Sequence, residues 1–268
     1  MRGVRLCSYV VAMLAVAALA VPAAAVTFSI IESDASHTLI EIEVPTPQIK
    51  SIVLDERPFD LVAVEGAGDW GDLGDPTLAV AATLIAIPPT SGVELRIIDE
   101  QYGTMRCSEL LPVQPAGRLK GDPLSYNEAA YSGSSFSPEN SVLVGDPAIL
   151  RDYRVVPLRV YPLAYNASSE ELRYVKRLVI ELDYSTAGTI NLKTRNRPTS
   201  AAFRPLYEET IANFDFVKTR YESDERGKYL IITHDDYYAS ILPLAEWKHK
   251  RGMEVEIAKL SVIGSSSS

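Results

Sequence analysis

The final forty residues constrain this chain most, because they begin a fold that they cannot complete. Lys228–Thr233 is a short apolar run typical of a buried strand, Tyr237–Arg251 has the pattern of an amphipathic helix, and Glu254–Ala258 is a second strand. Two strands joined by a crossover helix predict a parallel βαβ unit. Such a unit leaves two sheet edges and one sheet face uncovered. We therefore expect a fragment of a longer protein, in which residues 228–268 begin a truncated α/β domain.

Upstream of this unit the hydrophobic period is two, which is the period of strands. Apolar and polar side chains alternate along residues 40–44, 93–97 and 178–182. Each pattern turns one face to a core and the other to water, as in antiparallel sheets. Most prolines lie at strand ends, but Pro157 lies inside a run and predicts an edge strand or a bulge.

Many short strands with Pro and Gly between them predict a mainly β fold, an antiparallel β-sandwich over residues 26–187. The polar turn Asn166–Glu170 separates two strand-like runs, so we expect residues 154–165 and 171–184 to pair as a hairpin. Leu111–Gly145 is rich in Pro, Gly, Ser and Asn and is too long for a hairpin loop. Loops of that length are functional or disordered.

Residues 188–227 are expected to form a linker that contains a helix. Residues 188–200 are polar, and apolar side chains then recur at helical spacing over Phe203–Val217. Pro205 lies where the first turn of that helix would be, a position that proline tolerates.

The N-terminus has the three parts of a secretory signal peptide. Arg2 and Arg5 precede the uncharged apolar segment Leu6–Ala20, and a run of alanines follows. We predict residues 1–25 as the signal, with cleavage after Ala25 and a secreted or cell-surface product. The alternative is an uncleaved membrane anchor, but the apolar segment is shorter than the roughly 20 residues of a membrane span. No stable membrane span is expected after cleavage.

Charge and cysteine content exclude some classes of protein. The net charge of -9 argues against a nucleic-acid partner, since such proteins carry a basic face. Cys7 leaves with the signal, so Cys107 is the one remaining thiol, with no disulfide framework and no CxxC metal pair. Cys107 is either a nucleophile or a buried apolar side chain. No His lies near it in sequence to activate it, which favours burial.

The three histidines offer few candidates for catalysis. His37 lies beside a strand start and His249 at a helix C-terminus, and both are expected to be structural. His234 follows the first parallel strand, where open α/β sheets bind ligands, and Asp235 and Asp236 come next. These residues could orient a base or hold a metal. We favour the simpler interpretation, in which Asp235 or Asp236 caps the following helix.

Three aspartates in the segment GDWGDLGD (68–75) superficially resemble a calcium loop. The closing Glu of an EF-hand is absent, so we expect a surface turn and no metal site. No GxGxxG, P-loop, HExxH or GxSxG motif occurs. The residues alone therefore contain no catalytic constellation.

The segment from about Asp60 to Val217 nevertheless resembles the propeptide of the gingipain family of secreted cysteine endopeptidases. The matching pieces are residues 74–78 (GDPTL), 85–88 (IAIP), 150–154 (LRDYR), Tyr161-Pro162, Tyr165-Asn166, Phe203, Tyr207 and Asn213-Phe214. The start of the family's caspase-like catalytic domain is similar to residues 229–233, Pro243-Leu244-Ala245, Trp247-Lys248 and Gly252.

The resemblance implies a cysteine-type endopeptidase precursor whose His/Cys dyad lies downstream of the first βαβ unit. His234 and Cys107 do not match the dyad positions, so no catalytic residue is assigned and this segment alone is expected to be inactive. The implied partners are the cognate catalytic domain and, for the full-length enzyme, a peptide or protein substrate. No cofactor is expected in this chain, although calcium is possible in the full-length protein.

The resemblance also implies that the propeptide acts as a folding chaperone and inhibitor. In a peptidase specific for basic residues, an inhibitory loop would offer Arg or Lys, so Arg118 and Lys120 of the long loop are candidates. The alternative is that both are solvated loop charges. Basic residues in the linker make it cleavable, and the candidate processing positions are Lys193, Arg195, Arg197, Arg220 and Arg226.

A second hypothesis is a secreted or surface-attached β-sandwich used for adhesion or binding. It explains the export signal and the alternating strands equally well. It does not explain a βαβ unit after a helical linker.

Overall fold

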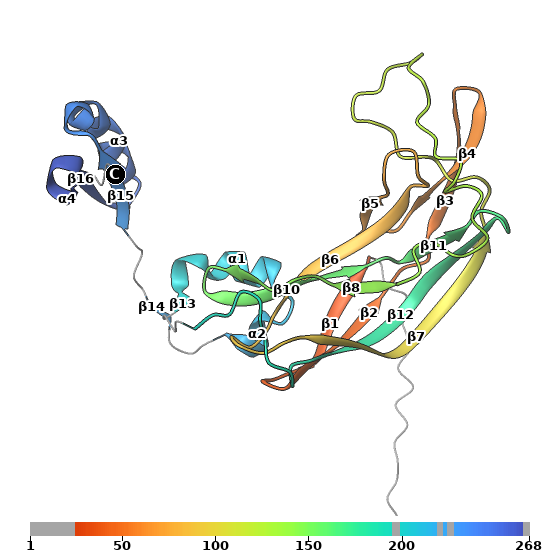
Figure 1. The fold of residues 1–268 in the computed structure, drawn as a ribbon, viewed down its shortest axis with the longest axis horizontal. Coiled ribbons are helices and arrows are strands. Elements are labelled where there is room, and N and C mark those ends of the chain that lie inside the picture. Colours follow the sequence, from red (N-terminus) through yellow and green to blue (C-terminus); the bar gives the residue numbers. More distant parts are fainter. Residues whose placement is uncertain (1–24, 195–198, 219–221, 224–227, 265–268) are drawn as a thin grey trace, which may run out of the picture.

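The computed structural model describes residues 25–194, 199–218, 222–223 and 228–264. Its largest part is a β-sandwich, followed along the chain by a short helical segment and a βαβ unit (Figure 1). The antiparallel sandwich and the parallel unit confirm the fold class predicted from the sequence.

The first sheet is organised around the long strand β12 (Glu171–Asp183). Its other strands are β1 (Thr27–Ser33), β2 (His37–Glu43), β7 (Glu94–Arg106) and β11 (Leu163–Asn166). β7 pairs with β12 along its whole length, and β11 and β2 pair in turn with the other side of β12. All pairs are antiparallel, as the alternating sequence predicts.

The second sheet is organised around β10 (Tyr153–Val160). Its other strands are β5 (Gly68–Trp70), β6 (Leu78–Ala86), β8 (Val142–Val144) and β9 (Ala148–Leu150). β6 pairs with one side of β10, whereas the short strands β8 and β9 share the other side.

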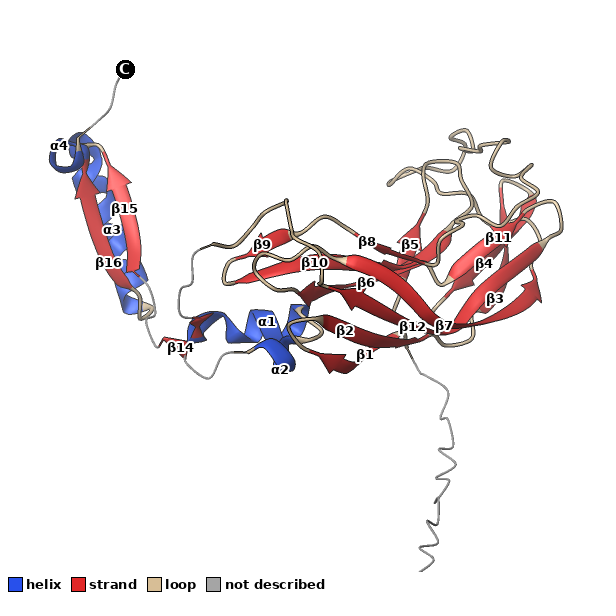
Figure 2. Cartoon of the chain, turned by 60° about the horizontal axis from the view of Figure 1, so that its bottom comes forward, coloured by secondary structure: helices blue, strands red, loops and turns tan. Residues whose placement is uncertain are grey.

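The two sheets pack face to face and enclose the main core (Figure 2). Ile40 and Leu178 from the first sheet and Ile85 and Leu158 from the second are 0% exposed. Burying each such side chain contributes about 1.5–3 kcal/mol, so this double layer dominates the stability of the sandwich.

Pro157 was expected at an edge strand or a bulge, and only the edge-strand expectation is wrong, because the register of the strands opposite Pro157 shifts by one residue between the pairs Val155–Ala148 and Leu158–Val144. β10 pairs on both sides, and its register with β6 continues through Pro157. The Pro157 carbonyl accepts a hydrogen bond from Gly145 N (2.8 Å), between the end of β8 and the start of β9. The nitrogen of the same residue faces the same gap, where a missing N–H leaves no partner unpaired.

The predicted hairpin is only half correct. Leu163–Asn166 pairs with Glu171–Tyr174 as expected, around the turn at 167–170. Residues 154–160 instead belong to β10 in the opposite sheet. The chain crosses between sheets near Tyr161 and Pro162, which the two-residue period of the sequence does not reveal.

A two-stranded hairpin extends from the sandwich beside the long loop. It is formed by β3 (Gln48–Leu54) and β4 (Arg57–Ala63). Its turn residues Asp55 and Glu56 have φ angles of 48° and 65°. Both central residues of a type I′ turn have positive φ, although Asn-Gly is the usual pair.

The helix expected over Phe203–Val217 is interrupted. Its residues form α1 (Arg204–Thr210) and α2 (Phe214–Val217), preceded by η1 (Ala201–Phe203) and by β13 (Thr199–Ser200). β13 pairs in parallel with β14 (Glu222–Ser223). Ile211 is extended (φ -108°, ψ 108°) and forms a bridge with Leu84 of β6. The helical part of the expected linker therefore packs on the sandwich.

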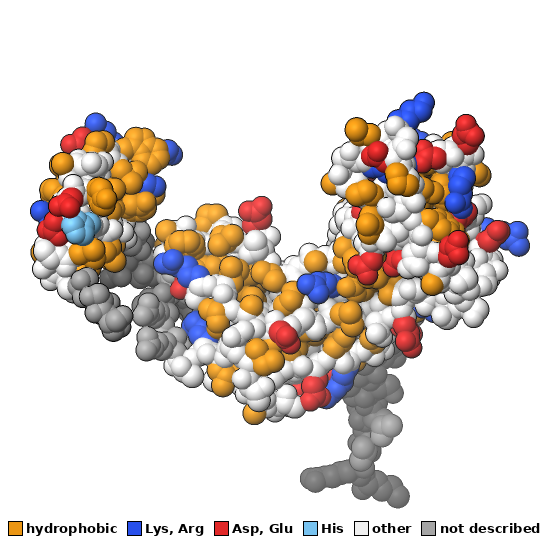
Figure 3. Space-filling model, turned by 45° about the horizontal axis from the view of Figure 1, so that its top comes forward, with side chains coloured by type: hydrophobic (Ala, Val, Ile, Leu, Met, Phe, Trp, Pro, Cys, Tyr) orange, Lys and Arg blue, Asp and Glu red, His pale blue; other side chains and the backbone are white. Residues whose placement is uncertain are grey.

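The C-terminal unit has the parallel topology that the sequence predicts. It consists of β15 (Lys228–Thr233), η2 (Asp235–Tyr237), α3 (Tyr238–Lys250), β16 (Glu254–Lys259) and α4 (Leu260–Ile263). Leu230 and Ile232 on β15 are 54% and 58% exposed, and Val262 is 80% exposed. Hydrophobic side chains accordingly lie open over the surface of this unit (Figure 3).

Candidate functional site

The candidate site is the long loop between β7 and β8, whose first residues are fixed to the sandwich. Thr77 N donates to the Leu111 carbonyl (2.8 Å), and Val113 N donates to the Asp75 carbonyl (2.9 Å). Pro112 forms an antiparallel bridge with Pro76 in the same stretch. The loop therefore leaves the body from a strand-like base.

A single glutamine closes the neck of the loop. The Gln114 side-chain amide donates to the Ser125 carbonyl (2.8 Å) and accepts from Ser125 N (3.1 Å). The same nitrogen donates to the Pro112 carbonyl (3.1 Å). Residues 115–124 thus form a tip whose two ends are tied together, as in a compact Ω-loop.

The returning leg of the loop is tied to the acidic segment 68–75. Asn127 N donates to the Gly74 carbonyl (2.9 Å), and the Asn127 amide nitrogen donates to the Asp75 carboxylate (2.7 Å). Gly74 has φ +88°, and a Cβ there would lie 3.1 Å from Asn127 N. Residues 71–75 form the surface turn that the sequence predicted, whereas residues 68–70 of the same segment form strand β5. Among the described residues no group of three or more His, Cys, Asp or Glu side chains is placed to hold a metal.

Aromatic side chains brace the loop against the β3–β4 hairpin, which extends beside it in Figure 1. The Tyr126 and Tyr131 rings stack with centroids 4.4 Å apart, and the Tyr131 hydroxyl donates to the Leu110 carbonyl (2.8 Å). The Arg57 guanidinium lies 4.8 Å from the Tyr126 ring centroid and donates to the Glu109 carboxylate (2.9 Å). Stacked and cation–π contacts stabilise this arrangement.

The two candidate residues of the tip, Arg118 and Lys120, differ in their exposure to solvent. The Arg118 side chain is only 9% exposed, because it folds back to pair with the Asp55 carboxylate of the hairpin turn. It also donates to the Asp122 carbonyl (2.5 Å). Lys120 is exposed, and its neighbour Leu119 is 71% exposed. Of the two basic residues, Lys120 is the one displayed to solvent.

Most of the other predicted positions lie in the connecting segments. Arg195, Arg197, Arg220 and Arg226 lie outside the described residues. Lys193 is described, and its backbone N donates to the Pro89 carbonyl (2.9 Å). The N–H of Val26, which follows the predicted cleavage position Ala25, donates to the Glu65 carbonyl (2.9 Å).

Cys107 has the environment of a structural thiol. It is 2% exposed, and burial, together with the nearby Asp60 carboxylate, raises its pKa to about 12. The Asp60 carboxylate is itself fixed by the Ser51 hydroxyl (2.7 Å) and Ser108 N (2.8 Å). A thiol held neutral in this way is inert at physiological pH, which confirms the interpretation as a buried side chain.

The helix cap at His234 differs from the one expected. The His234 ring nitrogen Nδ1 accepts from Asp236 N (3.3 Å), so His234 itself caps η2. Asp235, which we expected as a possible cap, accepts from the Ser261 hydroxyl (2.5 Å) and Ser261 N (3.1 Å). These hydrogen bonds lower the pKa of Asp235. The Asp235–Ser261 hydrogen bonds tie the start of α4 to the 3-10 turn that precedes α3.

The residues that brace the loop could not have been found from the sequence. Asp55, Gln114 and Tyr126 belong to common residue types without a motif, and each acts through a tertiary contact. The one available signal was the unusual length of the loop.

Comparison with known proteins matches this chain to one family and to relatives of one kind. The family Propeptide_C25 matches residues 22–221. Gingipain R2 of Porphyromonas gingivalis is 23% identical over 190 residues, covering 69% of this chain and 26% of that protein. Lys-gingipain HG66 of the same species is 24% identical over 239 residues, covering 84% of this chain and 13% of that protein. The chain therefore spans about a quarter or less of the length of these relatives.

Two solved structures share the fold. One is the complex of Porphyromonas gingivalis RgpB pro- and mature domains, with a TM-score of 0.60 and 17% identity, covering 71% of this chain and 97% of that chain. The other describes the zymogenic latency of gingipain K, with a TM-score of 0.53 and 21% identity, covering 62% and 97%.

The sandwich is thus of the class of gingipain-type propeptides, as the resemblance implied. The chain belongs to the Propeptide_C25 family, whose match extends through the sandwich and its helical segment.

Proposed function

We propose that this chain is the N-terminal part of a secreted gingipain-type cysteine endopeptidase precursor, in which the sandwich inhibits the catalytic domain and assists its folding. The His/Cys dyad lies outside the chain. The family match and the printed description of a relative as a complex of pro- and mature domains support this proposal. The observation that carries it is the braced loop, which displays a basic residue at its tip.

A braced loop is suited to inhibition for an entropic reason. A flexible segment must be ordered when it binds, at a cost of about 0.5–1.5 kcal/mol for each immobilised side chain. The Gln114–Ser125 hydrogen bonds and the stacked Tyr126 and Tyr131 rings order this loop before it meets a partner. The tip can therefore bind across a substrate cleft with little further loss of entropy.

Lys120 is the preferred residue for the substrate pocket of the peptidase. It is exposed on the tip, whereas Arg118 would first have to leave Asp55 and the Asp122 carbonyl. A pocket that accepts Lys120 belongs to a peptidase that cleaves after basic residues. In this arrangement Arg118 fixes the shape of the tip.

The chaperone role is supported by the contrast between the two parts of the chain. The sandwich has a closed core, whereas the βαβ unit leaves Leu230 and Ile232 on one sheet face exposed. A folded sandwich that binds the catalytic domain stabilises the bound state by mass action and so favours folding of that domain.

Export and metal content complete the proposal. Cleavage after Ala25 would release the precursor to the cell exterior or surface. Among the described residues no helix is both long and apolar enough to cross a membrane. Calcium, if the precursor binds it, would be held by residues of the full-length enzyme.

Inhibition assays with tip variants test this proposal. Residues 26–268 are titrated against the mature catalytic domain of the same precursor with a basic-P1 peptide substrate. The Lys120→Ala variant should have an inhibition constant at least about 10-fold higher than the unchanged chain, because it loses the side chain that anchors the interface. Glu128→Ala, an exposed change outside the tip, is the control. Unchanged inhibition by Lys120→Ala would remove Lys120 from the pocket, and turnover by residues 26–268 alone would refute the assignment of the dyad.

A further inference from the structure

The helical segment has a small hydrophobic core of its own against the sandwich. Tyr207, Ile211 and Phe214 of the segment are 0%, 2% and 2% exposed. They pack on Ala86, Val155 and Tyr153 of strands β6 and β10. The Tyr153 ring makes edge-to-face contacts with both aromatic partners, at centroid distances of 4.9 and 5.6 Å.

Polar contacts also fix the same segment to the sandwich. The Tyr207 hydroxyl donates to the Asp152 carboxylate (2.6 Å), which also accepts from Ser200 N (3.2 Å). Between α1 and α2, Ala212 N donates to the Leu84 carbonyl (2.9 Å), so the backbone extends the sheet at β6. Figure 2 shows α1 and α2 lying along the end of the sandwich near β1 and β2.

The position of this segment along the chain divides the candidate processing sites. Arg195 and Arg197 precede it, whereas Arg220 and Arg226 follow it. A cut at the first pair leaves residues 201–217 on the downstream piece, although these residues are buried against the upstream piece.

We propose that residues 201–217 form a helical clasp, which keeps the two pieces bound noncovalently after a cut on its N-terminal side. Only a cut after Val217 then separates the sandwich from the unit that follows. The significance for zymogen processing rests on the proposed function. The clasp itself does not, because both sides of the contact are in this chain.

The contact has the composition of a stable interface. Fully buried aromatic side chains at the centre of an interface carry most of its binding energy. Tyr207 and Phe214 occupy that position, and both sides of the contact are already in their bound form at the moment of the cut. A clasp of this kind makes an upstream cut insufficient for release.

Two double variants test the clasp with an arginine-specific endopeptidase. Arg220→Gln/Arg226→Gln retains only the upstream sites of the connecting segments, and Arg195→Gln/Arg197→Gln retains only the downstream sites. Each digest is run on a native size-exclusion column and on a denaturing gel. We expect the first variant to be cut yet to elute as one species, and the second to separate into two. If Arg195 and Arg197 resist cleavage, a site-specific protease sequence in place of residues 195–198 makes the same cut.

Substitutions within the clasp give the control. Adding Tyr207→Ala to the first variant should weaken the association of its fragments about 100-fold or more, so that they separate on the column. Adding Phe216→Ala, a change at a 52% exposed position of the same segment, should leave them together. Native separation of the fragments without any clasp substitution would overturn the proposal, as would co-elution of the fragments of the second variant. Neither assay measures inhibition, so the proposal of the clasp and the proposal of the inhibitory loop are tested independently.

Discussion

The side-chain amide of Asn213 takes the place of a neighbouring strand for Ala86 at the end of β6. Its oxygen accepts from Ala86 N (2.8 Å), and its nitrogen donates to the Ala86 carbonyl (2.9 Å) and to the Ser33 hydroxyl (3.1 Å). Asn213 is 0% exposed. One side chain therefore satisfies a buried backbone donor and acceptor and joins α2 to both sheets.

Asn213→Leu should lower the free energy of unfolding by about 2–4 kcal/mol, because it leaves two buried backbone groups of Ala86 without partners. Urea unfolding followed by circular dichroism measures this change. Asp215→Ala is the matched control on the same helix, since its side chain is 81% exposed, and should change stability by less than about 0.5 kcal/mol. If both variants lowered the free energy of unfolding equally, Asn213 would not be needed to pair the backbone groups of Ala86.

Arg154 should be essential for holding the chain where it leaves the sandwich. Its guanidinium, on a residue 2% exposed, donates to four backbone carbonyls, those of Pro88, Ser91, Ile190 and Asn191, at 2.6–3.0 Å. Arg154→Leu leaves these carbonyls unpaired and should cost about 3 kcal/mol or more.

Amide hydrogen exchange gives a local measurement of this contact. Gly188 and Lys193 donate backbone hydrogen bonds to the 89–90 turn, and in Arg154→Leu their amides should lose protection before the strands do. Arg159→Leu, at an exposed position of the same strand, is the control. Full protection of Gly188 in Arg154→Leu would contradict this account.

Cys107 should react slowly with thiol reagents. Its pKa of about 12 leaves almost no thiolate at pH 8, and its burial blocks access. We expect modification in the native protein to be at least about 100-fold slower than in urea, measured with a chromogenic disulfide. Reaction at the unfolded rate would reopen a nucleophilic role.

The raised pKa of Cys107 also makes the stability of the fold depend on pH in the alkaline range. The folded pKa is raised, so the stability contribution of the Cys107 thiol is complete below the ordinary thiol value of about 9. It is lost as the pH rises from about 9 towards 12. Cys107→Val should therefore lose less stability between pH 8 and 10 than the native chain does.

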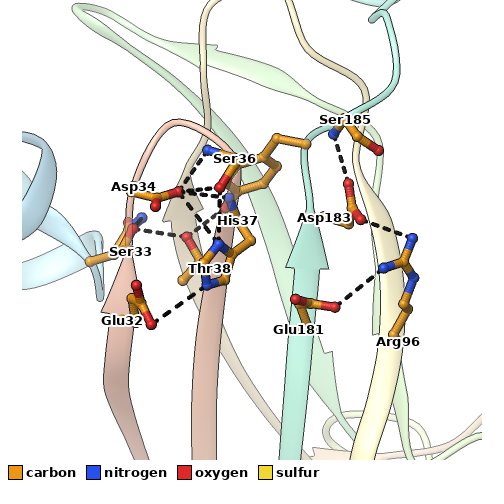
Figure 4. A network of polar contacts seen from close by, with 12 residues as sticks. Glu32, Ser33, Asp34, Ser36, His37, Thr38, Arg96, Glu181, Asp183 and Ser185 are labelled. Carbon is orange, nitrogen blue, oxygen red and sulfur yellow. Dashed lines mark hydrogen bonds and ion pairs between the residues drawn. The ribbon is translucent and has the colours of Figure 1, made fainter.

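Asp34 should make the stability of the fold depend on pH in the acid range. In the β1–β2 turn its carboxylate accepts from the Ser36 hydroxyl (2.7 Å), Ser36 N (2.7 Å) and His37 N (3.0 Å) (Figure 4). These bonds lower its pKa from 3.8 to about 2. The stability it provides is complete above the unfolded value and disappears as the pH falls from about 4 to 2. Asp34→Asn should show a shallower loss of stability over that range, and an identical slope would contradict the assignment.

The alternating segments predicted the sandwich because a half-buried strand must repeat every two residues, as the pattern at Ile40 and Ile42 does. The βαβ unit was equally predictable, since Lys228–Thr233 and the helix after it carry local signals. Local signals could not show where the chain changes sheets, and so residues 154–160 were assigned to the wrong partner. Nor could they show that Pro157 faces a gap between two short strands.

The site was predictable only as a long loop with two basic residues. Which of these residues is displayed depends on Asp55, which lies in the turn of a hairpin distant in sequence from Arg118. The packing of the expected linker depends likewise on Tyr207 and Asn213 meeting strands β6 and β10. Contacts of this kind arise from tertiary structure, and no spacing in the sequence encodes them.

The most direct test of the central claim is the activity of the mature catalytic domain of this precursor, titrated with purified residues 26–268. A braced inhibitory sandwich predicts inhibition with a constant of about 1 μM or lower, corresponding to about 8 kcal/mol of binding free energy. Undiminished turnover of a basic-P1 peptide at a concentration about 100-fold above that value would contradict it.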